Sequence, residues 1–532
     1  MKPSLANALW AASCLPEWRR FQRAAERVQE TQTDLLSSYL KQNKTTEYGE
    51  CYHFDTLTSP SQYQGRVPLS TYDDYVEYVA RIGEGAQSIL TNEPVRMFEL
   101  SSGSSAASKL IPYTDSLRSE FQRGIAPWIY NLYTNIPDLL GGPAYWSITP
   151  LTDGKRFTSA RLPIGFESDS EYLGLLGRWL VDSIMAVPNV VKSISDTDTF
   201  RYITLLHLLR QPGLRLISIW NPTFLSLLLA SLPAWWKSLL FDIERGTLSL
   251  QDVELRFVPK PDRARALRVL SPTDYESLWP RLRLISCWMD GASARYARQL
   301  GERFPHVELQ AKGLLATEAF VSVPILRLEG SVLAINSHFF EFIDDSGEAL
   351  LAHQIEKGKT YSVVVTTGGG FYRYQLFDLI EVIGHWKQIP RIRFVGKADH
   401  ISDWFGEKLE ERFVAGVLEK IYVKYQISPA FATLAPDEAV GFRYVLYIES
   451  DDCNDILAED LDKALRENFH YDYCRKLGQL GHVKVVQVTR GAEIYLRACQ
   501  ARGQKLGNIK PSVLQRTTGW SKWFEAEKEL AL

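Results

Sequence analysis

Apolar residues recur every three or four positions along the first 50 residues of the chain. Charged residues fill the positions between them, as in EWRRFQRAAERVQETQTDLLSSYLKQ. This spacing places the apolar side chains on one face and predicts amphipathic helices. Residues 66–90 predict a further helix with acidic side chains in its first turn. Residues 171–260 are mostly helical by the same pattern, with proline residues as breaks.

Shorter apolar runs predict strands in the second half of the chain. The segments RLRLISCW, VELQAKGLLA and SVLAINSHFFEFI have the length and composition of strands in a mixed sheet. TYSVVVTTGGGFYRYQLFDLIEVIG predicts two more strands, joined by a glycine turn at residues 368–370. From about Gly396 onward helices and strands alternate. We therefore expect an α/β fold with a large N-terminal domain of mixed sheets and helices at residues 1–394. A smaller, mobile α+β domain is expected at residues 395–532.

One stretch is apolar enough to test as a membrane span. Residues 223–241 are interrupted by Pro233 and Lys237. The uncharged part is therefore shorter than the ~20 residues that a span needs. This interruption favours a buried helix or a pair of helices. The N-terminal stretch is short, interrupted and a poor match to a signal peptide.

The composition is that of a folded globular chain. Its 532 residues are 45% hydrophobic and 23% charged, which excludes disordered, collagenous and coiled-coil proteins. With a formal net charge of −3, the chain lacks the overall positive charge that is typical of a nucleic-acid-binding protein. The six cysteines include no C-x-x-C pair. We therefore expect reduced thiols in a cytoplasmic protein without a structural zinc site.

A loop of small residues, SSGSSAASK at 101–109, follows a predicted strand and precedes a predicted helix. Small residues let the backbone approach a polyphosphate, and hydroxyl and N–H groups can bind phosphate oxygens. The candidate phosphate contacts are Ser102, Gly103, Ser104 and Ser105, and Lys109 could neutralise charge on a departing pyrophosphate. The segment does not fit the Walker A pattern. A serine-rich turn without a ligand is the alternative interpretation.

Several segments resemble the AMP-forming acyl-adenylating superfamily in the order of its motifs. SSGSSAASKLIPYT resembles the phosphate-binding loop T-S-G-[ST]-[ST]-G-x-P-K. Leu-Ala-Thr317-Glu318 resembles [YG]-x-[ST]-[ST]-E, and YRYQLFD at 372–378 resembles Y-R-Y-x-x-G-D. Within the superfamily, K-L-I-P, WNPTF and SCWMDG are most similar to the GH3 family of acyl acid–amido synthetases. Two residues depart from the motifs, because Ala106 and Phe377 stand where glycine is usual.

The resemblance implies a role for individual residues in binding ATP and Mg²⁺. Thr317 would lie near the nucleotide phosphate, Glu318 would hold Mg²⁺, and Asp378 would accept hydrogen bonds from the ribose hydroxyls. Tyr372 would stack near the adenine. Lys397 lies in FVGKADHIS, which resembles the hinge F-x-G-R-x-D-x-[IL] that precedes the mobile domain.

A catalytic lysine is also implied near the C-terminus. Lys510, which precedes a proline, matches the family's mobile catalytic lysine best, and Lys505 is the competing candidate. Such a cation would stabilise the adenylation transition state, together with Lys109 and Glu318.

The implied reaction has two steps. A carboxylic acid attacks the α-phosphate of ATP and releases pyrophosphate, and an amine, usually an amino acid in this family, then takes the acyl group from the acyl-adenylate. An acyl- or aryl-CoA ligase with the same first step is the alternative, followed by a catalytically silent nucleotide-binding protein. Plausible walls of the pocket for an apolar or aromatic acid are Trp146, Phe166 and Phe320, and Arg161 could bind a substrate carboxylate. We expect neither nucleic acid nor a membrane as a partner.

Overall fold

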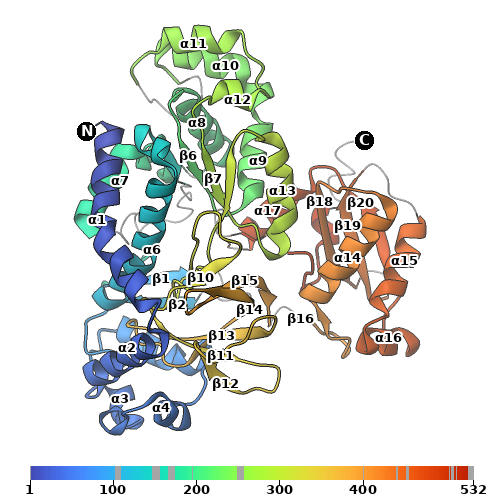
Figure 1. The fold of residues 1–532 in the computed structure, drawn as a ribbon. Helices are drawn as coiled ribbons and strands as arrows, with labels where there is room; N and C mark the ends of the chain where they lie inside the picture. Colours follow the sequence, from blue (N-terminus) through green and yellow to red (C-terminus); the bar gives the residue numbers. More distant parts are fainter. Residues whose placement is uncertain are drawn as a thin grey trace. The chain divides into compact units, whose positions relative to one another are not determined.

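The computed structural model describes residues 2–101, 109–146, 156–165, 174–194, 196–248, 257–398, 401–438, 441–450, 455–502, 504, 509–510 and 512–524. The chain divides into two compact units (Figure 1). Unit 1 comprises residues 1–290, 294–376 and 380–394, and unit 2 comprises residues 291–293, 377–379 and 395–532.

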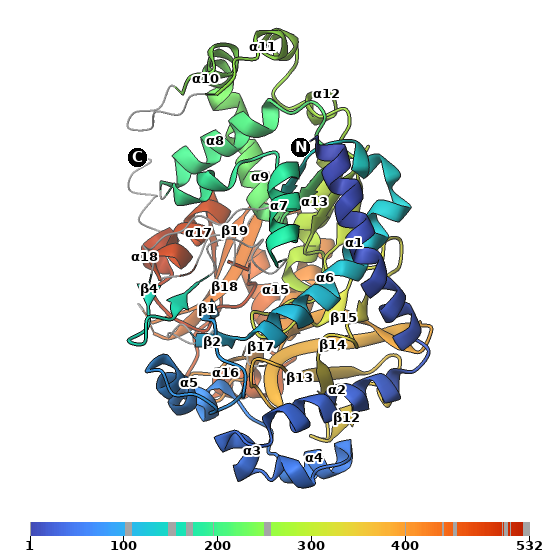
Figure 2. The ribbon, with the colours of Figure 1, turned by 90° about the vertical axis from the view of Figure 1, so that its left-hand side faces the viewer.

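Helices open unit 1, as the first 50 residues predict. They are α1 (Pro3–Ala24), α2 (Val28–Asn43), α3 (Glu47–Cys51), α4 (Pro60–Arg66) and α5 (Val76–Gly83). Thr71 and Asp74 form a capping box before α5, which confirms the predicted acidic first turn. The long helix α6 (Asp115–Asn135) packs along α1, and Figure 2 shows the two side by side.

The serine-rich loop joins two antiparallel strands. These are β1 (Met97–Ser101) and β2 (Lys109–Tyr113), which pair from Met97 opposite Tyr113 to Ser101 opposite Lys109. The predicted strand before the loop is β1 and the predicted helix after it is α6, but the strand β2, which lies between the loop and α6, was not predicted. With β4 (Arg156–Phe157) and β5 (Pro163–Ile164) they form a sheet in the order β2-β1-β5-β4.

A four-stranded parallel sheet has the order β3-β6-β7-β8. Its strands are β3 (Ala144–Trp146), β6 (Leu216–Ser218), β7 (Leu284–Cys287) and β8 (Glu308–Ala311). The accompanying helices are α7 (Gly174–Ile184), α8 (Thr197–Leu209), α9 (Pro222–Ala230), α10 (Leu232–Arg245), α11 (Pro261–Arg268), α12 (Tyr275–Leu278) and α13 (Ala294–Arg303). Leucines of α8, α9 and α10 form a buried core with this sheet.

The apolar stretch at 223–241 forms two helices, α9 and α10, as expected. Among the described residues no single helix could cross a membrane by length and hydropathy; α9 and α10 pass that test only as a pair bent by 70°.

A seven-stranded sheet completes unit 1. Its order is β12-β11-β13-β14-β15-β10-β9. The strands are β9 (Ser322–Val323), β10 (Ser331–Leu333), β11 (Phe339–Ile343), β12 (Ala349–Leu351), β13 (Thr360–Thr366), β14 (Tyr374–Trp386) and β15 (Ile389–Lys397). SVLAINSHFFEFI, which we expected as one strand, splits into β10 and β11 around a turn in which Ser337 N–H donates to Ala334 O.

Unit 2 is an α+β layer. The three-stranded sheet has the order β18-β19-β20, with strands Phe431–Asp437, Arg443–Glu449 and Lys484–Gln487. The short strands β16 (Ile401–Ser402) and β17 (Leu409–Glu410) pair with each other, and the helices are α14 (Glu411–Tyr425), α15 (Asp455–Leu465), α16 (Phe469–Lys476), α17 (Gly491–Ala501) and α18 (Ser521–Phe524). Its own buried core joins α14 and α15 to the sheet.

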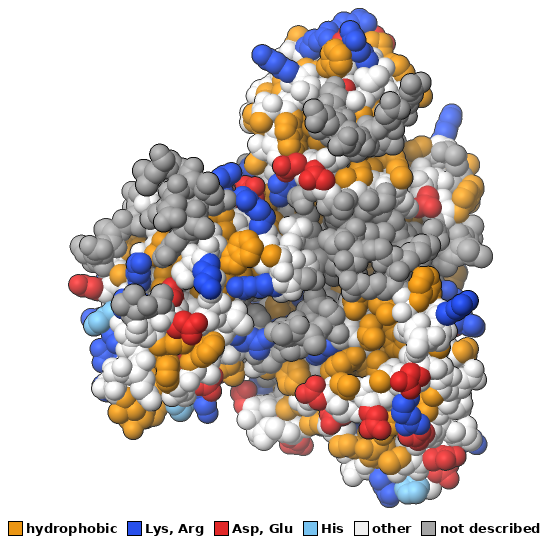
Figure 3. Space-filling view, turned by 180° about the vertical axis from the view of Figure 1, so that it is seen from behind, with side chains coloured by type: hydrophobic (Ala, Val, Ile, Leu, Met, Phe, Trp, Pro, Cys, Tyr) orange, Lys and Arg blue, Asp and Glu red, His pale blue; other side chains and the backbone are white. Residues whose placement is uncertain are grey.

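The surface carries both signs of charge. Figure 3 shows acidic and basic side chains interspersed on one face of the molecule, with Lys and Arg over α11. Two of the α11 arginines pair with acids, Arg265 with Asp262 and Arg268 with Glu244. Exposed ion pairs of this kind contribute at most about 1 kcal/mol to stability.

Candidate active site

The structure brings two predicted site residues, 209 positions apart in sequence, to one tyrosine. Lys109 Nζ lies 3.5 Å from the Tyr374 hydroxyl and 5.6 Å from the centre of the Tyr72 ring. The Tyr374 hydroxyl donates in turn to the carboxylate of Glu318, which is only 7% exposed. Burial, and after it the nearby charge of Glu318, raise the pKa of Tyr374, so it stays a neutral donor. A cation, a phenol and a carboxylate thus form one cluster.

Thr317 and Glu318 lie at the tip of a tight β-hairpin. Leu315 and Phe320 form an antiparallel bridge, and Ala316 N–H donates to Ala319 O at 2.9 Å. The Tyr113 hydroxyl, at the end of β2, donates to the carbonyl of Thr317 at 2.5 Å. The strand that begins at Lys109 therefore also holds the hairpin tip.

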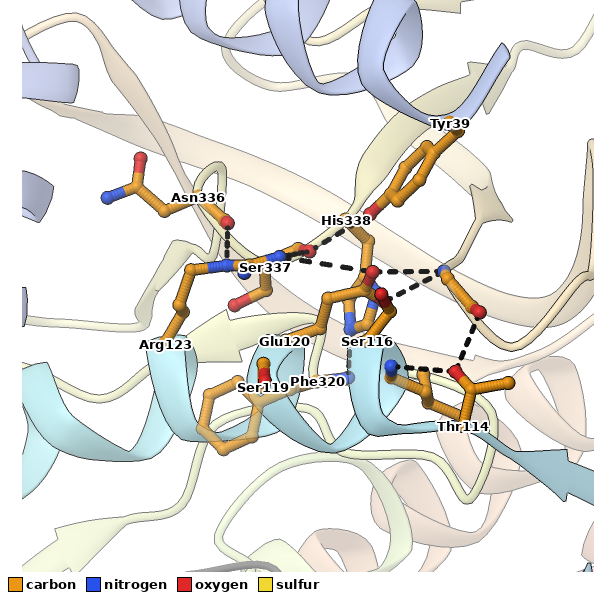
Figure 4. Close-up of polar contacts among 12 residues, drawn as sticks. Tyr39, Thr114, Ser116, Ser119, Glu120, Arg123, Phe320, Asn336, Ser337 and His338 are labelled. Atoms are coloured by element: carbon orange, nitrogen blue, oxygen red, sulfur yellow. Dashed lines mark hydrogen bonds and ion pairs between the residues drawn. The ribbon is translucent and has the colours of Figure 1, made fainter. Parts of the chain in front are cut away.

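A buried pair, Glu120 on α6 and His338 before β11, supports the same hairpin (Figure 4). Phe320 N–H donates to His338 Nε2 at 2.9 Å, so the proton of the neutral ring is on Nδ1. Nδ1 lies 2.9 Å from Glu120 Oε2, although at an angle outside hydrogen-bond range. Both side chains are 0–1% exposed. The hydrogen bond from Phe320 N–H selects this tautomer of His338, and the carboxylate of Glu120 lies beside the protonated nitrogen.

The glycine turn at 368–370 is held by the same helix. Both carboxylate oxygens of Glu120 lie 3.0 Å from Gly368 N–H, and the Thr114 hydroxyl donates to Gly368 O at 2.8 Å. A Cβ at Gly368 would lie 2.4 Å from Glu120 Oε1, so only glycine allows this approach. Glu120 thus joins the turn before β14 to the hairpin that carries Glu318.

An N-terminal helix braces the segment that carries His338. Gln32 on α2 donates to Ile335 O at 2.7 Å and to His338 O at 2.8 Å, and accepts from Phe340 N–H at 2.8 Å. Gln32 is 4% exposed, so its amide replaces water for three backbone groups.

Replacing Glu120 by Gln is expected to weaken the contacts that hold the hairpin and the glycine turn in place. The substitution keeps an acceptor for Gly368 but removes the charge beside His338. We expect the free energy of unfolding to fall by about 1–3 kcal/mol and the KM for ATP to rise by about tenfold, since hydrogen bonds to charged groups contribute that much. Titration with ATP and thermal unfolding measure the two effects. Ser119→Ala, on the exposed side of the same helix turn, is the control and should change neither. A loss of stability with an unchanged KM would show that the pair does not position the hairpin.

The motif that follows the glycine turn is mostly structural. Tyr372 is 0% exposed, stacks on Tyr48 with ring centres 4.8 Å apart, and donates to Leu90 O at 2.7 Å. These contacts place its ring in the protein core and not at a nucleotide. The prediction that Tyr372 stacks near the adenine is therefore wrong. Arg373 forms a buried ion pair with Glu341 at 3.0 Å.

Asp378 presents a buried acceptor in unit 2. It is 2% exposed, and its Oδ1 lies 3.3 Å from Lys397 Nζ without a hydrogen-bond donor among the described residues. Phe377, before it, adopts φ 58°, the left-handed region that glycine occupies without cost. This conformation explains the glycine of the family motif, and a non-glycine residue in it costs about 1–2 kcal/mol.

The predicted substrate-pocket residues have different environments. Trp146 is half-buried at the end of β3, and Phe320 is 4% exposed with its ring against Gly124 of α6. Arg161 is exposed in the turn between β4 and β5. Phe166 and the loop residues Ser102, Gly103, Ser104 and Ser105 lie outside the described residues.

The candidate lysine of the C-terminal segment is exposed. Tyr495 on α17 donates to the Lys510 carbonyl at 3.1 Å, and the neighbouring Ile509 is 1% exposed. The backbone at Lys510 is therefore anchored while its side chain reaches solvent. The competing Lys505 lies outside the described residues.

Asp290 carries a pH-dependent charge after β7. Burial raises its pKa to about 6, opposed by the hydrogen bond from Phe394 N–H and by Arg393. The folded chain binds this proton more tightly than the unfolded chain, so the stability that the protonated carboxyl allows is present below pH 3.8 and is lost as pH rises from there through about 6.

Asp290→Asn is therefore expected to stabilise the protein at pH 7.5. A rise in pKa from 3.8 to about 6 corresponds to about 3 kcal/mol, and partial exposure of the side chain reduces the gain to about 1–2 kcal/mol. The difference should shrink at pH 5, where the wild-type carboxyl is largely protonated. Thermal unfolding of both proteins at the two pH values measures it. An equal difference in stability at the two pH values would show that the charge of Asp290 is not its cause.

Comparison with known proteins decides the family. The model of the GH3 family N-terminal domain matches residues 17–309, that of the central domain residues 331–397, and that of the C-terminal domain residues 423–518. The chain belongs to the GH3 family. The order of motifs predicted this membership from the sequence.

Relatives and solved structures agree with the GH3 assignment. Indole-3-acetic acid-amido synthetase GH3.2 of Arabidopsis thaliana is 25% identical over 81% of this chain and 86% of its own length. The solved structure of AtGH3.15 acyl acid amido synthetase in complex with 2,4-DB matches with a TM-score of 0.84 at 19% identity, covering 97% of this chain and 96% of its own. A 2-hydroxyisobutyryl-CoA ligase matches with a TM-score of 0.54 at 10% identity, covering 94% and 92%. These structures confirm the predicted adenylate-forming α/β fold.

Sequence reasoning missed several residues of the candidate site. Glu120 lies on the buried face of α6 among Leu117, Phe121 and Gly124. An acidic residue among apolar ones on a helix face indicates that it has a buried partner. The partner His338 and the bridging Tyr374 carry no such signal, because only the fold brings them to Glu120 and Glu318.

Proposed function

We propose that this protein is an ATP-dependent acyl acid–amido synthetase. It activates a carboxylic acid as an acyl-adenylate and transfers the acyl group to an amine, an amino acid in the first place. The observation that carries the proposal is the cluster of Lys109, Tyr374 and Glu318 in a chain of the GH3 family. The domain of residues 395–532 acts as the mobile lid, and residues 1–394 hold the acid and the nucleotide.

In the first step a carboxylate oxygen of the acid attacks the α-phosphorus of ATP. The bond from that phosphorus to the pyrophosphate oxygen breaks, and pyrophosphate leaves with the electron pair. Lys109, after the serine-rich loop, neutralises charge on the leaving group, and Lys510 does so at the α-phosphate. Such fixed cations stabilise charge that develops only in the transition state. Asp378 offers its buried acceptor to a ribose hydroxyl, which as a donor would satisfy it.

The residues fit a Mg²⁺ ion that arrives with ATP. No group of three or more candidate ligands exists among the described residues. Mg²⁺ needs only one or two carboxylates beside phosphate oxygens and water, and Glu318 with Thr317 supplies that set. The ion would screen the phosphate charges against the attacking carboxylate.

In the second step the amine nitrogen attacks the acyl carbon. The bond from that carbon to the AMP oxygen breaks, AMP leaves, and the amine loses one proton. The product is an amide.

Exchange of labelled pyrophosphate into ATP, with pooled carboxylic acids and no acceptor, tests the proposal. Acid-dependent exchange supports adenylation, and amino acids and coenzyme A are then compared as acceptors. Amide formation supports the proposal, whereas a thioester alone would make the protein a CoA ligase. ATP binding without any exchange would make it a silent nucleotide-binding homologue.

A further inference from the structure

Tyr72, which lies outside the predicted motifs, holds the start of strand β2. Its hydroxyl accepts from Leu110 N–H at 2.7 Å and donates to Leu110 O at 3.2 Å. A phenol oxygen can do both, and the N–H and C=O of one residue in an antiparallel ladder point to the same side. Because β2 is the edge strand of its sheet, Tyr72 takes the place of a further strand at the residue next to Lys109.

The ring of the same tyrosine lies near the ammonium group of Lys109. Lys109 Nζ is 5.6 Å from the centre of the Tyr72 ring and 3.5 Å from the Tyr374 hydroxyl. An aromatic face at such a distance attracts a cation. Tyr72 therefore contacts both the backbone beside Lys109 and the charge at the end of its side chain.

The segment that carries Tyr72 is itself fixed. Ser70 pairs with Tyr374 in a parallel bridge. Thr71 donates from its N–H and its hydroxyl to the carboxylate of Asp74, at 2.7 and 3.1 Å. One short segment thus sets the positions of both phenols that lie beside the ammonium group.

The hydroxyl of Tyr72 keeps its proton. Burial raises the pKa of Tyr72, the hydrogen bond with the backbone of Leu110 opposes this rise, and the charge of Glu318 adds to it. A neutral phenol is required here, because the same oxygen has to donate to a carbonyl and accept from an N–H.

We propose that Tyr72 is a positioning residue for the adenylation step, which acts by holding the ammonium group of Lys109 in place for the departing pyrophosphate. A lysine side chain has much rotational freedom, and a cation that is already fixed needs no reorganisation when charge develops on the leaving group. The inference rests on the proposed function, which assigns Lys109 to that group. The second step releases no pyrophosphate, so Tyr72 should not affect it.

Pyrophosphate exchange in variants of Tyr72 tests the inference. Tyr72→Phe keeps the ring and loses the hydroxyl, so the kcat of exchange should fall about 3–10-fold and the KM for pyrophosphate should rise by a similar factor. Tyr72→Leu loses both contacts and should show losses of about 10–100-fold. The KM for the acid should stay within about twofold in both variants. Tyr78→Phe, a half-buried tyrosine of α5 whose ring packs on Tyr48, is the matched control and should change nothing.

A double-mutant cycle shows whether Tyr72 acts through Lys109. In Lys109→Met, which has a similar length but no charge, adding Tyr72→Leu or Tyr72→Phe should lower exchange by less than about twofold further, because the cation to be positioned is gone. Losses that multiply would show that Tyr72 does not act through Lys109, and unchanged exchange in both single variants would show that Lys109 needs no positioning.

The second step separates positioning from a merely structural role. Synthetic acyl-adenylate should react with the amine at within about twofold of the wild-type rate in Tyr72→Phe, and thermal unfolding shows that this variant is folded at the assay temperature. Equal losses in both steps would show that Tyr72 only supports the fold. These contrary results overturn the inference but leave the proposed function intact. Wild-type protein without acid-dependent exchange would instead remove the proposed function, and this inference with it.

Discussion

Lys510→Ala is expected to lower the rate of acyl-adenylate formation by about 10²–10³-fold, which is the effect of removing one fixed charge from a transition state. The affinity for ATP should change by less than about threefold, because this contact is made only when charge develops at the α-phosphate. The side chain of Lys510 is exposed and its backbone is anchored, so the substitution should leave the fold intact. Pyrophosphate exchange and equilibrium binding of ATP measure the two quantities.

Two further measurements show whether the loss comes from the charge of Lys510 itself. Lys505→Ala is the matched control and should retain exchange; a large loss there with activity kept in Lys510→Ala would transfer the role to Lys505. Synthetic acyl-adenylate should still react with the amine in Lys510→Ala at close to the wild-type rate, because the second step no longer needs charge on the phosphate. Loss of both steps would point to misfolding.

Glu318→Gln is expected to reduce exchange by about 10²–10³-fold, with a marked increase in the Mg²⁺ concentration needed for half-maximal rate. Gln keeps the shape and an acceptor for Tyr374 but lacks the charge that holds the ion. Exchange measured over a series of MgCl₂ concentrations at fixed ATP shows the shift.

Tyr374→Phe is the comparison for Glu318→Gln. It removes the hydroxyl that joins Lys109 to Glu318 but leaves the carboxylate, so a smaller loss of about tenfold is expected, with an unchanged Mg²⁺ requirement. If Glu318→Gln lost activity with the same Mg²⁺ dependence as the wild type, the carboxylate would not be an ion ligand.

The sequence predicted most elements because their signals are local. The helices of the first 50 residues and the strands β13 and β14 follow from the spacing of apolar residues. The strand β2 was missed because KLIPY contains a proline. Its place at the edge of its sheet explains why that proline is tolerated.

The candidate site could be predicted only in part. Motif order identified Lys109 and Glu318, and the fold brings both to Tyr374. The same motif made Tyr372 a nucleotide contact, whereas its neighbours Tyr48 and Leu90 hold it in the core. These partners are distant in sequence, so no local pattern could reveal them.

The amide of Gln32 has a consequence for any attempt to shorten the protein. Helix α2 contributes no residue to the candidate site. Its Gln32 nevertheless hydrogen-bonds two carbonyls and one N–H in the segment that carries His338. A chain trimmed to begin after residue 43 would lose these three hydrogen bonds, at about 0.5–1.5 kcal/mol each. The minimal catalytic fragment therefore has to include helices that contribute no residue to the chemistry.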